Sequence, residues 1–471
     1  MAILDMPNEL LLSVGETLST PDLYSFLSTC SRLSSLFTSR LHDLVVQDEG
    51  GTAVLKWAME HSHTPLAKLA ISLGAEIDKL YKVDYGSEQG NHHHTPLHWA
   101  AFHGHSDAIR FLLARGAKMD AKDYNDETPL HLAALHGRSD ATRVLLELGA
   151  DMACANERSE MPAHLAARGS VDCMEAFVDA GFDLSAKGPC GGTVLHVAAH
   201  YTSINMVEYL LGQEEVKVAI DAQDWDLFTP LHLAVLDSEI VKLLLRHGAD
   251  MEVRNSKGLM PAHRAACGDI RGLDPESLRV FIDAGFDLTL RASHNQTVLH
   301  YVVAFFHHQE VVEYLLEQPA TRALVNAQDQ GGRTPLSWID KRSFGPEREW
   351  MTNSLIRYGA DLGLADWWEK TPADRIRMTH LGPTSWWDID ISYSHWDDRY
   401  YIPWDEDYQS DLWERSEYEN EESTSKGGEE GEGEKSTSKG REEGEGEESP
   451  SEREEDEGEE SPSEDEESPS C

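Results

Sequence analysis

The sequence lacks most features that mark secreted, membrane-spanning or metal-binding proteins. Its 471 residues include only six cysteines, none of them in Cys-x-x-Cys spacing. This pattern argues against a disulfide framework or a zinc site and fits a reducing compartment. No run of eighteen apolar residues occurs, and the N-terminus has no basic n-region, so we expect neither a membrane span nor a signal peptide. We therefore expect an intracellular protein, cytoplasmic, nuclear or both, that binds no membrane.

Basic residues are also scarce. The chain has 40 Lys and Arg against 85 Asp and Glu, a formal net charge of −45. Such a surface repels phosphate backbones, so we expect no nucleic-acid partner, whereas a basic protein partner or simple solubility fits. A Gly-rich phosphate loop and a Gly-x-Ser-x-Gly elbow are both missing. We therefore expect no enzyme activity, no catalytic residues and no cofactor.

What the sequence does contain is a repeated motif. The stretch Thr128-Pro129-Leu130-His131-Leu132-Ala133-Ala134 recurs in variants that begin at Thr95, Met161, Thr193, Thr229, Met260, Thr297, Thr334 and, in degraded form, Thr371. Successive starts lie 33, 33, 32, 36, 31, 37, 37 and 37 residues apart. A period near 33 that opens with Thr-Pro-Leu-His resembles the ankyrin-repeat family, over roughly residues 51 to 380.

The resemblance implies that each unit is a loop, a helix, a turn and a second helix. Thr caps the first helix and Pro takes its first position, while Gly in sequences such as Gly149-Ala150-Asp151 ends the second. A diverged first repeat is expected around Leu55-Lys56-Trp57-Ala58, followed by an insertion that contains His92-His93-His94. Each repeat buries its apolar face against its neighbours. We expect an all-α solenoid of about eight to nine repeats.

A second, longer period indicates that a block of three repeats was duplicated. Met161-Pro162-Ala163-His164 recurs as Met260-Pro261-Ala262-His263, and the repeats that begin at Thr128 and Thr193 recur at Thr229 and Thr297. We predict that the two Met-Pro-Ala-His units are structurally more alike than either is to its sequence neighbours.

The 23 histidines raise the question of a metal site. Seven occupy the same repeat position, where the ankyrin resemblance implies a structural hydrogen bond to the hairpin: His98, His131, His164, His196, His232, His263 and His300. The His92–His94 run suits a transition metal, but no Cys or carboxylate stands at a matching ligand spacing. We expect no metal.

Large apolar and aromatic residues at the hairpin tips and the ends of the first helices are the candidates for substrate binding, because the family's concave face is mostly polar there. Aromatic anchors are favoured at binding hot spots, although scattered apolar surface residues often tuck beneath neighbouring loops. The candidates are Phe102, His103, Tyr124, Leu135, His136, Tyr201, Trp225, Phe228, Leu236 and Phe305.

Residues 1–50 predict three short helices that bury too little surface to be comfortably stable alone. They resemble the F-box of fungal-type proteins through Met6-Pro7-Asn8-Glu9-Leu10-Leu11, Leu18-Ser19, Asp22-Leu23 and Thr29-Cys30-Ser31-Arg32-Leu33. In that family the motif docks on the Skp-type linker subunit of a cullin–RING ubiquitin ligase. The resemblance implies linker contacts by Pro7, Leu10, Leu11, Val14, Leu18 and Leu23. The alternative is an N-terminal cap that seals the repeat array.

The C-terminal part divides into two segments. Trp367, Trp368 and five later tryptophans are interleaved with Asp and Tyr, and residues 381–413 are expected to cap the last repeat or to link it to the tail. Residues 414–471 carry 25 acidic and 6 basic residues and no aliphatic ones. We expect this tail to be disordered.

Together the two resemblances predict a substrate adapter of an SCF-type ubiquitin ligase, in which the F-box binds the linker and the ankyrin array binds a protein substrate. Such a chain supplies proximity and no chemistry. The alternatives are an ankyrin scaffold without a ligase role and an effector that uses another organism's ligase.

Overall fold

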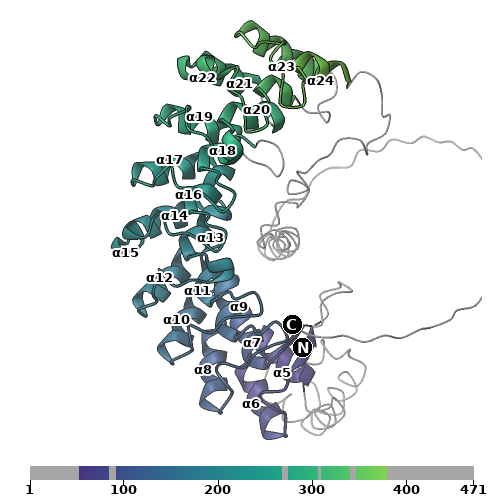
Figure 1. Cartoon of the computed structure of the whole chain (residues 1–471). Coiled ribbons are helices and arrows are strands. Elements are labelled where there is room, and N and C mark those ends of the chain that lie inside the picture. Colours follow the sequence, from purple (N-terminus) through teal and green to yellow (C-terminus); the bar gives the residue numbers. More distant parts are fainter. Residues whose placement is uncertain (1–51, 84–91, 268–273, 306–308, 340–345, 379–471) are drawn as a thin grey trace, which may run out of the picture. The chain divides into compact units, whose positions relative to one another are not determined.

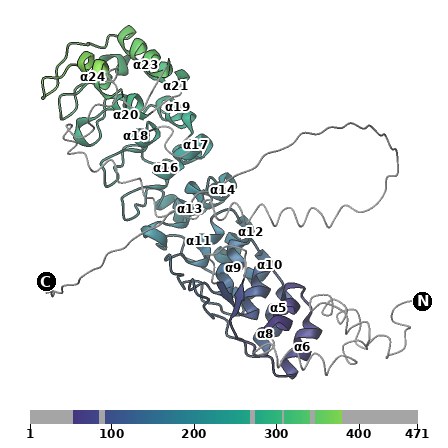
Figure 2. The ribbon, with the colours of Figure 1, turned by 90° about the vertical axis from the view of Figure 1, so that its right-hand side faces the viewer.

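The computed structural model describes residues 52–83, 92–267, 274–305, 309–339 and 346–378. The predicted F-box segment, the segment 381–413 and the acidic tail lie outside these ranges. Within them the chain forms nine helix pairs followed by one last helix, α24 (Pro372–Met378). Successive pairs pack side by side in chain order (Figures 1 and 2), each contacting only its neighbours along the stack. This is the solenoid arrangement that the repeat period predicts.

The first helices of the pairs lie together on one side of the stack (Figure 1). They are α5 (Thr52–Glu60), α7 (Pro96–Phe102), α9 (Pro129–Leu135), α11 (Pro162–Ala166), α13 (Val194–His200), α16 (Pro230–Leu233) with the 3₁₀ turn η3 (Ala234–Leu236), α18 (Pro261–Ala265), α20 (Val298–Phe305) and the 3₁₀ turn η5 (Pro335–Trp338).

The second helices lie on the other side (Figure 1). They are α6 (Thr64–Ser72), α8 (Ser106–Ala114), α10 (Ser139–Glu147), α12 (Val171–Asp179), α14 (Ile204–Leu211), α17 (Ser238–Arg246), α19 (Pro275–Asp283), α21 (Gln309–Glu317) and α23 (Pro346–Arg357). Two of them are followed by an extra short helix, α15 (Glu214–Val218) after α14 and α22 (Pro319–Leu324) after α21. These extra helices account for the long steps of 36 and 37 residues that follow Thr193 and Thr297.

One prediction is wrong in detail, because the described chain is not entirely helical. The insertion after the first repeat forms a two-stranded antiparallel sheet, β1 (Tyr81–Val83) paired with β2 (His92–His94). The three histidines were expected in a loop. Instead the strand places His93 and His94 on opposite faces, because neighbouring side chains alternate along a strand. Two further 3₁₀ turns, η2 (Pro189–Gly191) and η4 (Ser293–Asn295), lie in hairpins.

The core runs continuously between the two helix layers. It is built from the Leu and Ala of the repeated motif and from the apolar face of each second helix, as in Leu130, Ala133 and Leu145, all at most 1% exposed. Small Ala residues let consecutive first helices approach closely, and α7 packs against both α5 and α9. Each fully buried Leu contributes about 1.5–3 kcal/mol. No described repeat forms a complete core by itself, so the burial of its apolar residues depends on the repeats on either side.

The duplicated block is visible in the helix lengths. The first helices of the two Met-Pro-Ala-His units, α11 and α18, both have five residues. Their neighbours α9, α13 and α20 have seven or eight, and α16 has four before it continues into η3. The extra helices α15 and α22 also fall in corresponding repeats of the two blocks. Both features agree with the predicted duplication of three repeats.

Candidate protein-interaction surface

Five first helices begin with the same hydrogen-bond network, shown here for α9. His131 Nδ1 accepts a hydrogen bond from the backbone N–H of Thr128 (3.0 Å) and lies 2.8 Å from Thr128 Oγ1. His131 Nε2 lies 3.1 Å from the carbonyl oxygen of Glu160, to which it donates. The network therefore caps one helix and ties it to the next hairpin. It recurs at Thr95–His98, Thr193–His196, Thr229–His232 and Thr297–His300.

The predicted hydrogen bond fails in the other two repeats, which begin with Met. His164 and His263 are fully buried, but neither ring nitrogen of either residue has a hydrogen-bond partner. The His164 ring turns toward the next hairpin, where its Nε2 lies 2.4 Å from the position that a Cβ on Gly188 would occupy. Burial lowers the pKa of His164 to about 4, and the negative charge of Glu160 is the largest effect that opposes the shift. Met at this position has no hydroxyl group, so the histidine ring lacks its partner at the helix N-terminus and does not take part in the cap.

Restoring threonine at the half-exposed Met161 is expected to stabilise the protein by about 0.5–1 kcal/mol, because a Thr at the N-cap accepts a bond from the N3 backbone N–H. The urea midpoint of Met161→Thr should rise. Met260→Thr is the matched control, since Met260 is 1% exposed and loses buried apolar surface. Equal midpoint shifts in both variants would contradict this account.

A second recurring device shapes the hairpins between repeats. The side-chain oxygen of an Asp or Asn accepts hydrogen bonds from the backbone N–H groups two and four residues later, as Asp123 Oδ1 does from Asn125 (2.9 Å) and Glu127 (2.8 Å). This Asp or Asn was not predicted from the sequence, although in every such hairpin it lies five residues before the motif's first residue. The other members with the same pair of bonds are Asn156, Asp224, Asn255, Asp329 and Asp366.

Consecutive hairpins are joined at their tips. The backbone N–H of Trp225 donates a hydrogen bond to the carbonyl oxygen of Cys190 in the preceding tip (2.8 Å). In the same way, the backbone N–H of Trp367 donates to the carbonyl oxygen of Gly331 (3.1 Å). Both indoles lie over a glycine of the preceding hairpin. A Cβ on Gly191 would stand 2.5 Å from Trp225 Cδ1, and one on Gly332 would stand 2.7 Å from Trp367 Cδ1. The two tryptophans nevertheless remain 72% and 74% exposed.

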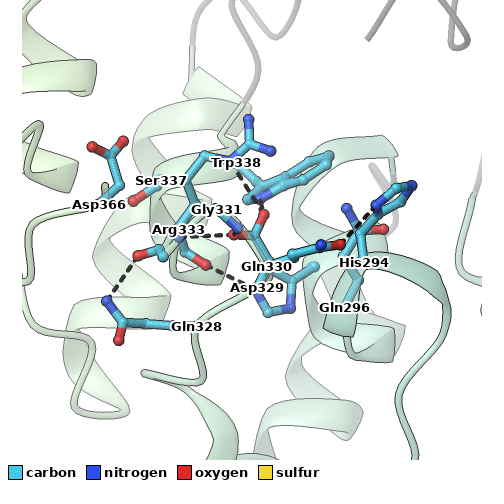
Figure 3. A network of polar contacts seen from close by, with 12 residues as sticks. His294, Gln296, Gln328, Asp329, Gln330, Gly331, Arg333, Ser337, Trp338 and Asp366 are labelled. Atoms are coloured by element: carbon cyan, nitrogen blue, oxygen red, sulfur yellow. Dashed lines mark hydrogen bonds and ion pairs between the residues drawn. The ribbon is translucent and has the colours of Figure 1, made fainter. Parts of the chain in front are cut away.

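Figure 3 shows the polar network around one hairpin aspartate. Asp329 Oδ2 accepts hydrogen bonds from Arg333 Nε (3.2 Å) and Trp338 Nε1 (3.0 Å). The Arg333 guanidinium carbon lies 4.8 Å from the centre of the Trp338 ring and 5.7 Å from that of Trp368. Trp367 and Trp368 thus belong to the hairpin before α24, and not to the Trp-rich segment with which the sequence analysis grouped them.

The ten candidate substrate-binding residues do not form one uniform surface. Tyr124 and Trp225 are exposed at hairpin tips, 56% and 72%. Phe102 and Phe228 are buried, 4% and 9% exposed, so the expectation of accessible anchors fails there. Phe102 packs on His136 with ring centroids 4.2 Å apart, and the Arg264 guanidinium lies 4.8 Å from the Phe228 ring. The remaining candidates are half-buried along the first-helix side of the array: His103, Leu135, His136, Tyr201, Leu236 and Phe305.

The part of the chain that the structure describes bears on two expectations from the sequence, the absence of a metal site and the absence of a membrane span. No group of three or more His, Cys, Asp or Glu there is arranged as a metal ion would require. In the same ranges no helix is both long enough and apolar enough to cross a membrane. His94 Nε2 instead lies 3.4 Å from the buried carboxylate of Asp123, which anchors the hairpin strand β2 to the array.

The family follows from residue ranges that match models of known domains. A three-copy ankyrin-repeat model matches residues 28–123, 55–156, 119–188 and 163–255, and a single ankyrin-repeat model matches residues 294–330. Together these ranges cover more than half of the chain. This is an ankyrin-repeat protein. Its described helix pairs are therefore ankyrin repeats, a protein-interaction architecture, and no F-box family model matches the chain.

The ankyrin-repeat chain is similar to several characterised proteins over part of their length. It is 36% identical to human "Ankyrin repeat and SOCS box protein 11" over 93 residues, which cover 19% of this chain and 28% of that protein. It is 26% identical to the chicken "Nuclear factor NF-kappa-B p105 subunit" over 231 residues, 48% of this chain and 23% of that protein. The chain thus spans less than a third of the length of these relatives.

Solved structures of ankyrin-repeat domains are also similar. The human ASB11 ankyrin repeat domain aligns with a TM-score of 0.42 and 25% identity, covering 47% of this chain and 97% of that one. The ankyrin repeat domain of Bcl-3 aligns with a TM-score of 0.40 and 30% identity, covering 47% and 98%.

Proposed function

We propose that this ankyrin-repeat protein is a substrate-recognition adapter of an SCF-type ubiquitin ligase. The observation that carries the proposal is the F-box-like pattern of residues 1–50, with Met6-Pro7-Asn8-Glu9-Leu10-Leu11 at its start, directly before the first repeat helix at Thr52. An array that binds proteins, joined to a segment that docks on a ligase, holds the substrate near the transferring enzymes. Proximity of this kind raises effective concentration without any catalytic residue in the adapter.

The two parts have separate tasks in this proposal. Pro7, Leu10, Leu11, Val14, Leu18 and Leu23 form the apolar contact with the Skp-type linker. The array contributes the substrate surface, with the exposed rings of Tyr124 and Trp225 as its accessible aromatic anchors. The relative named "Ankyrin repeat and SOCS box protein 11" likewise pairs ankyrin repeats with a second module in its name, which supports reading the two segments as a functional pair.

The full-length chain is expected to bind a purified Skp-type linker, and the double variant Leu11→Asp/Val14→Asp is expected to lose at least a hundredfold in affinity. Two carboxylates placed in an apolar interface must be desolvated without partners. Biolayer interferometry measures both. The matched control Ser13→Asp/Ser34→Asp adds the same charge to the same segment and should bind within about threefold of the wild type. Absent binding, or equal binding by both double variants, refutes the adapter proposal.

A second candidate is an ankyrin-repeat interaction scaffold without a ligase role. Its support is that the first match to the ankyrin model begins at residue 28, inside the segment assigned to the F-box. In this candidate residues 28–50 belong to an N-terminal capping repeat, which a solenoid needs at its open end. The linker-binding measurement separates the two candidates, because a cap has no affinity for the linker.

A further inference from the structure

A group of cationic and imidazole side chains gathers on the first-helix side of the N-terminal repeats. Lys56 of α5 places its Nζ 4.5 Å from the centre of the Trp99 ring. The His103 ring stacks on the Trp99 ring, with centroids 5.9 Å apart, and the His105 ring stacks on the His103 ring, with centroids 5.8 Å apart. With His61 and Arg138, these residues form what we call the basic aromatic surface: Lys56, His61, Trp99, His103, His105 and Arg138. The Trp99 ring is buried beneath the others, only 4% exposed.

The position of Arg138 depends on a glycine in the preceding repeat. Arg138 Nε donates a hydrogen bond to the carbonyl oxygen of Phe102 (3.0 Å), at the end of α7. On the way its side chain crosses Gly104, whose φ is +78° and where a Cβ would lie only 3.1 Å from Arg138 Cδ. The guanidinium therefore reaches back across one repeat and lies beside the histidines.

The charge of this surface is opposite to that of the chain. Burial is the largest cause that lowers the pKa of His103 to about 4, and the electrostatic effects of the neighbouring His105, Arg138, His61 and Lys56 act in the same direction, so His103 is neutral at physiological pH. The carboxylate of Glu60 forms an ion pair with Lys56, 3.7 Å from its Nζ, so a ligand carboxylate shares this cation with Glu60. Charges more than about 8 Å away are screened at physiological ionic strength. A ligand at this surface therefore responds to these cations more than to the net charge of −45.

We propose that the basic aromatic surface binds an acidic segment of a protein partner, with carboxylates paired to Lys56 and Arg138. Lys56 and Arg138 lie two repeats apart, with the imidazoles of His103 and His105 between them, a spacing that matches carboxylates along an extended peptide better than one compact anion. Charge-assisted pairs of Arg and Lys with carboxylates are the strong members of their class. The net charge of the chain favours a basic partner, so this local surface selects a different class of ligand.

In the proposed adapter, the substrate is a protein that carries an acidic segment. Only this consequence for ubiquitylation rests on the proposed function. The peptide binding itself does not need residues 1–50. Loss of linker binding would leave it intact, and loss of acidic-peptide binding would leave the linker interaction intact. The two failures are therefore distinguishable.

The test is selection of random 12-residue peptides displayed on phage against the immobilised full-length chain, followed by anisotropy titration of the enriched peptides as fluorescent synthetics. We expect a class with net negative charge whose affinity falls about tenfold or more in Lys56→Glu/Arg138→Glu. The control Arg110→Glu/Lys242→Glu makes the same charge change on the exposed second-helix side and should leave affinity within about twofold. Circular dichroism confirms that both variants are folded.

Three results would overturn the proposal. The first is that no acidic class is enriched. The second is that both double variants weaken binding equally, which would assign the effect to long-range charge. The third is that every acidic peptide recovered matches residues 414–471, which would make the chain's own tail the occupant of the surface in place of a partner.

Discussion

Lowering the pH from 7.5 to 5.5 is expected to destabilise this ankyrin-repeat protein by several kcal/mol. The cause is the set of buried histidines that are held neutral in the fold. Burial is the largest cause of the lowered pKa in each, to about 4 in His98, His164, His196, His200 and His300 and to about 3 in His232 and His263. The unfolded chain has a His pKa near 6.5.

The sign follows from which state binds the proton first. As the pH falls below 6.5, the unfolded histidines take up protons while the folded ones do not, so the equilibrium shifts toward the unfolded chain. The stability that the neutral histidines contribute is fully present above pH 6.5. It is lost between pH 6.5 and about 4, by up to about 1.4 kcal/mol per histidine per pH unit. Over the one unit from pH 6.5 to 5.5, four such groups together lose about 5 kcal/mol, the lower end of the typical total stability of about 5–15 kcal/mol.

Some carboxyl groups, Asp221 among them, work in the opposite direction because burial raises their pKa. Burial raises the pKa of Glu127 to about 8 and that of Asp224 to about 6, so the folded chain holds these protons more tightly and gains stability on acidification. Partial neutralisation of the −45 charge also relieves repulsion. The histidines outnumber these carboxyls, so the net effect remains destabilising.

Urea unfolding followed by far-UV circular dichroism at pH 7.5, 6.5 and 5.5 measures the effect, and the slope gives the number of protons taken up on unfolding. These conditions stay above the sequence pI of about 4.7, where precipitation threatens. His232→Gln should lower the slope by about one proton, because the pKa of His232 is lowered to about 3 in the fold. A slope of one proton or less at pH 5.5 is incompatible with the neutral buried histidines described above.

Removing the Asp329 carboxylate is expected to cost about 3–5 kcal/mol, because a buried charge pair and several hydrogen bonds lose the same partner. Asp329 Oδ1 accepts from the backbone N–H groups of Gly331 and Arg333, both at 2.8 Å. Its Oδ2 accepts from the Arg333 and Trp338 side chains. In Asp329→Ala the hairpin loses its internal bonds, and the Arg333 cation loses its carboxylate.

The chain itself provides the control for this substitution. Two other repeats carry asparagine at the corresponding position, and Asn255 Oδ1 makes the same two backbone bonds, to Lys257 (3.0 Å) and Leu259 (2.9 Å). Asp329→Asn should therefore keep the hairpin and lose the two bonds that Oδ2 accepts, from Arg333 and Trp338, at a cost of about 2–3 kcal/mol. Urea midpoints and hydrogen exchange of the Gly331 and Arg333 amides measure both variants. Equal losses in Ala and Asn would show that the backbone bonds contribute little.

The sequence by itself determined the architecture of the described repeats. Thr-Pro-Leu-His marks a helix start through local chemistry, since Thr caps, Pro suits the first helical position, and a period near 33 returns the same apolar face to the core. The equal lengths of the first helices in the two Met-Pro-Ala-His units agree with the likeness predicted from the pattern, because the duplicated blocks keep the same local sequence. Such features depend on residues that are close together in the chain.

Only the tertiary structure decided which side chains face a neighbour and which face solvent. His164 and His131 occupy the same motif position, yet one loses its hydrogen bonds because Met161 removes the hydroxyl and Gly188, in the next hairpin, makes room for the ring. Phe102 was expected at the surface and is buried against His136, a residue of the following repeat. In each case the deciding contact joins residues about a repeat apart. In a solenoid the environment of a side chain is set by the adjoining repeat, which the local pattern does not contain.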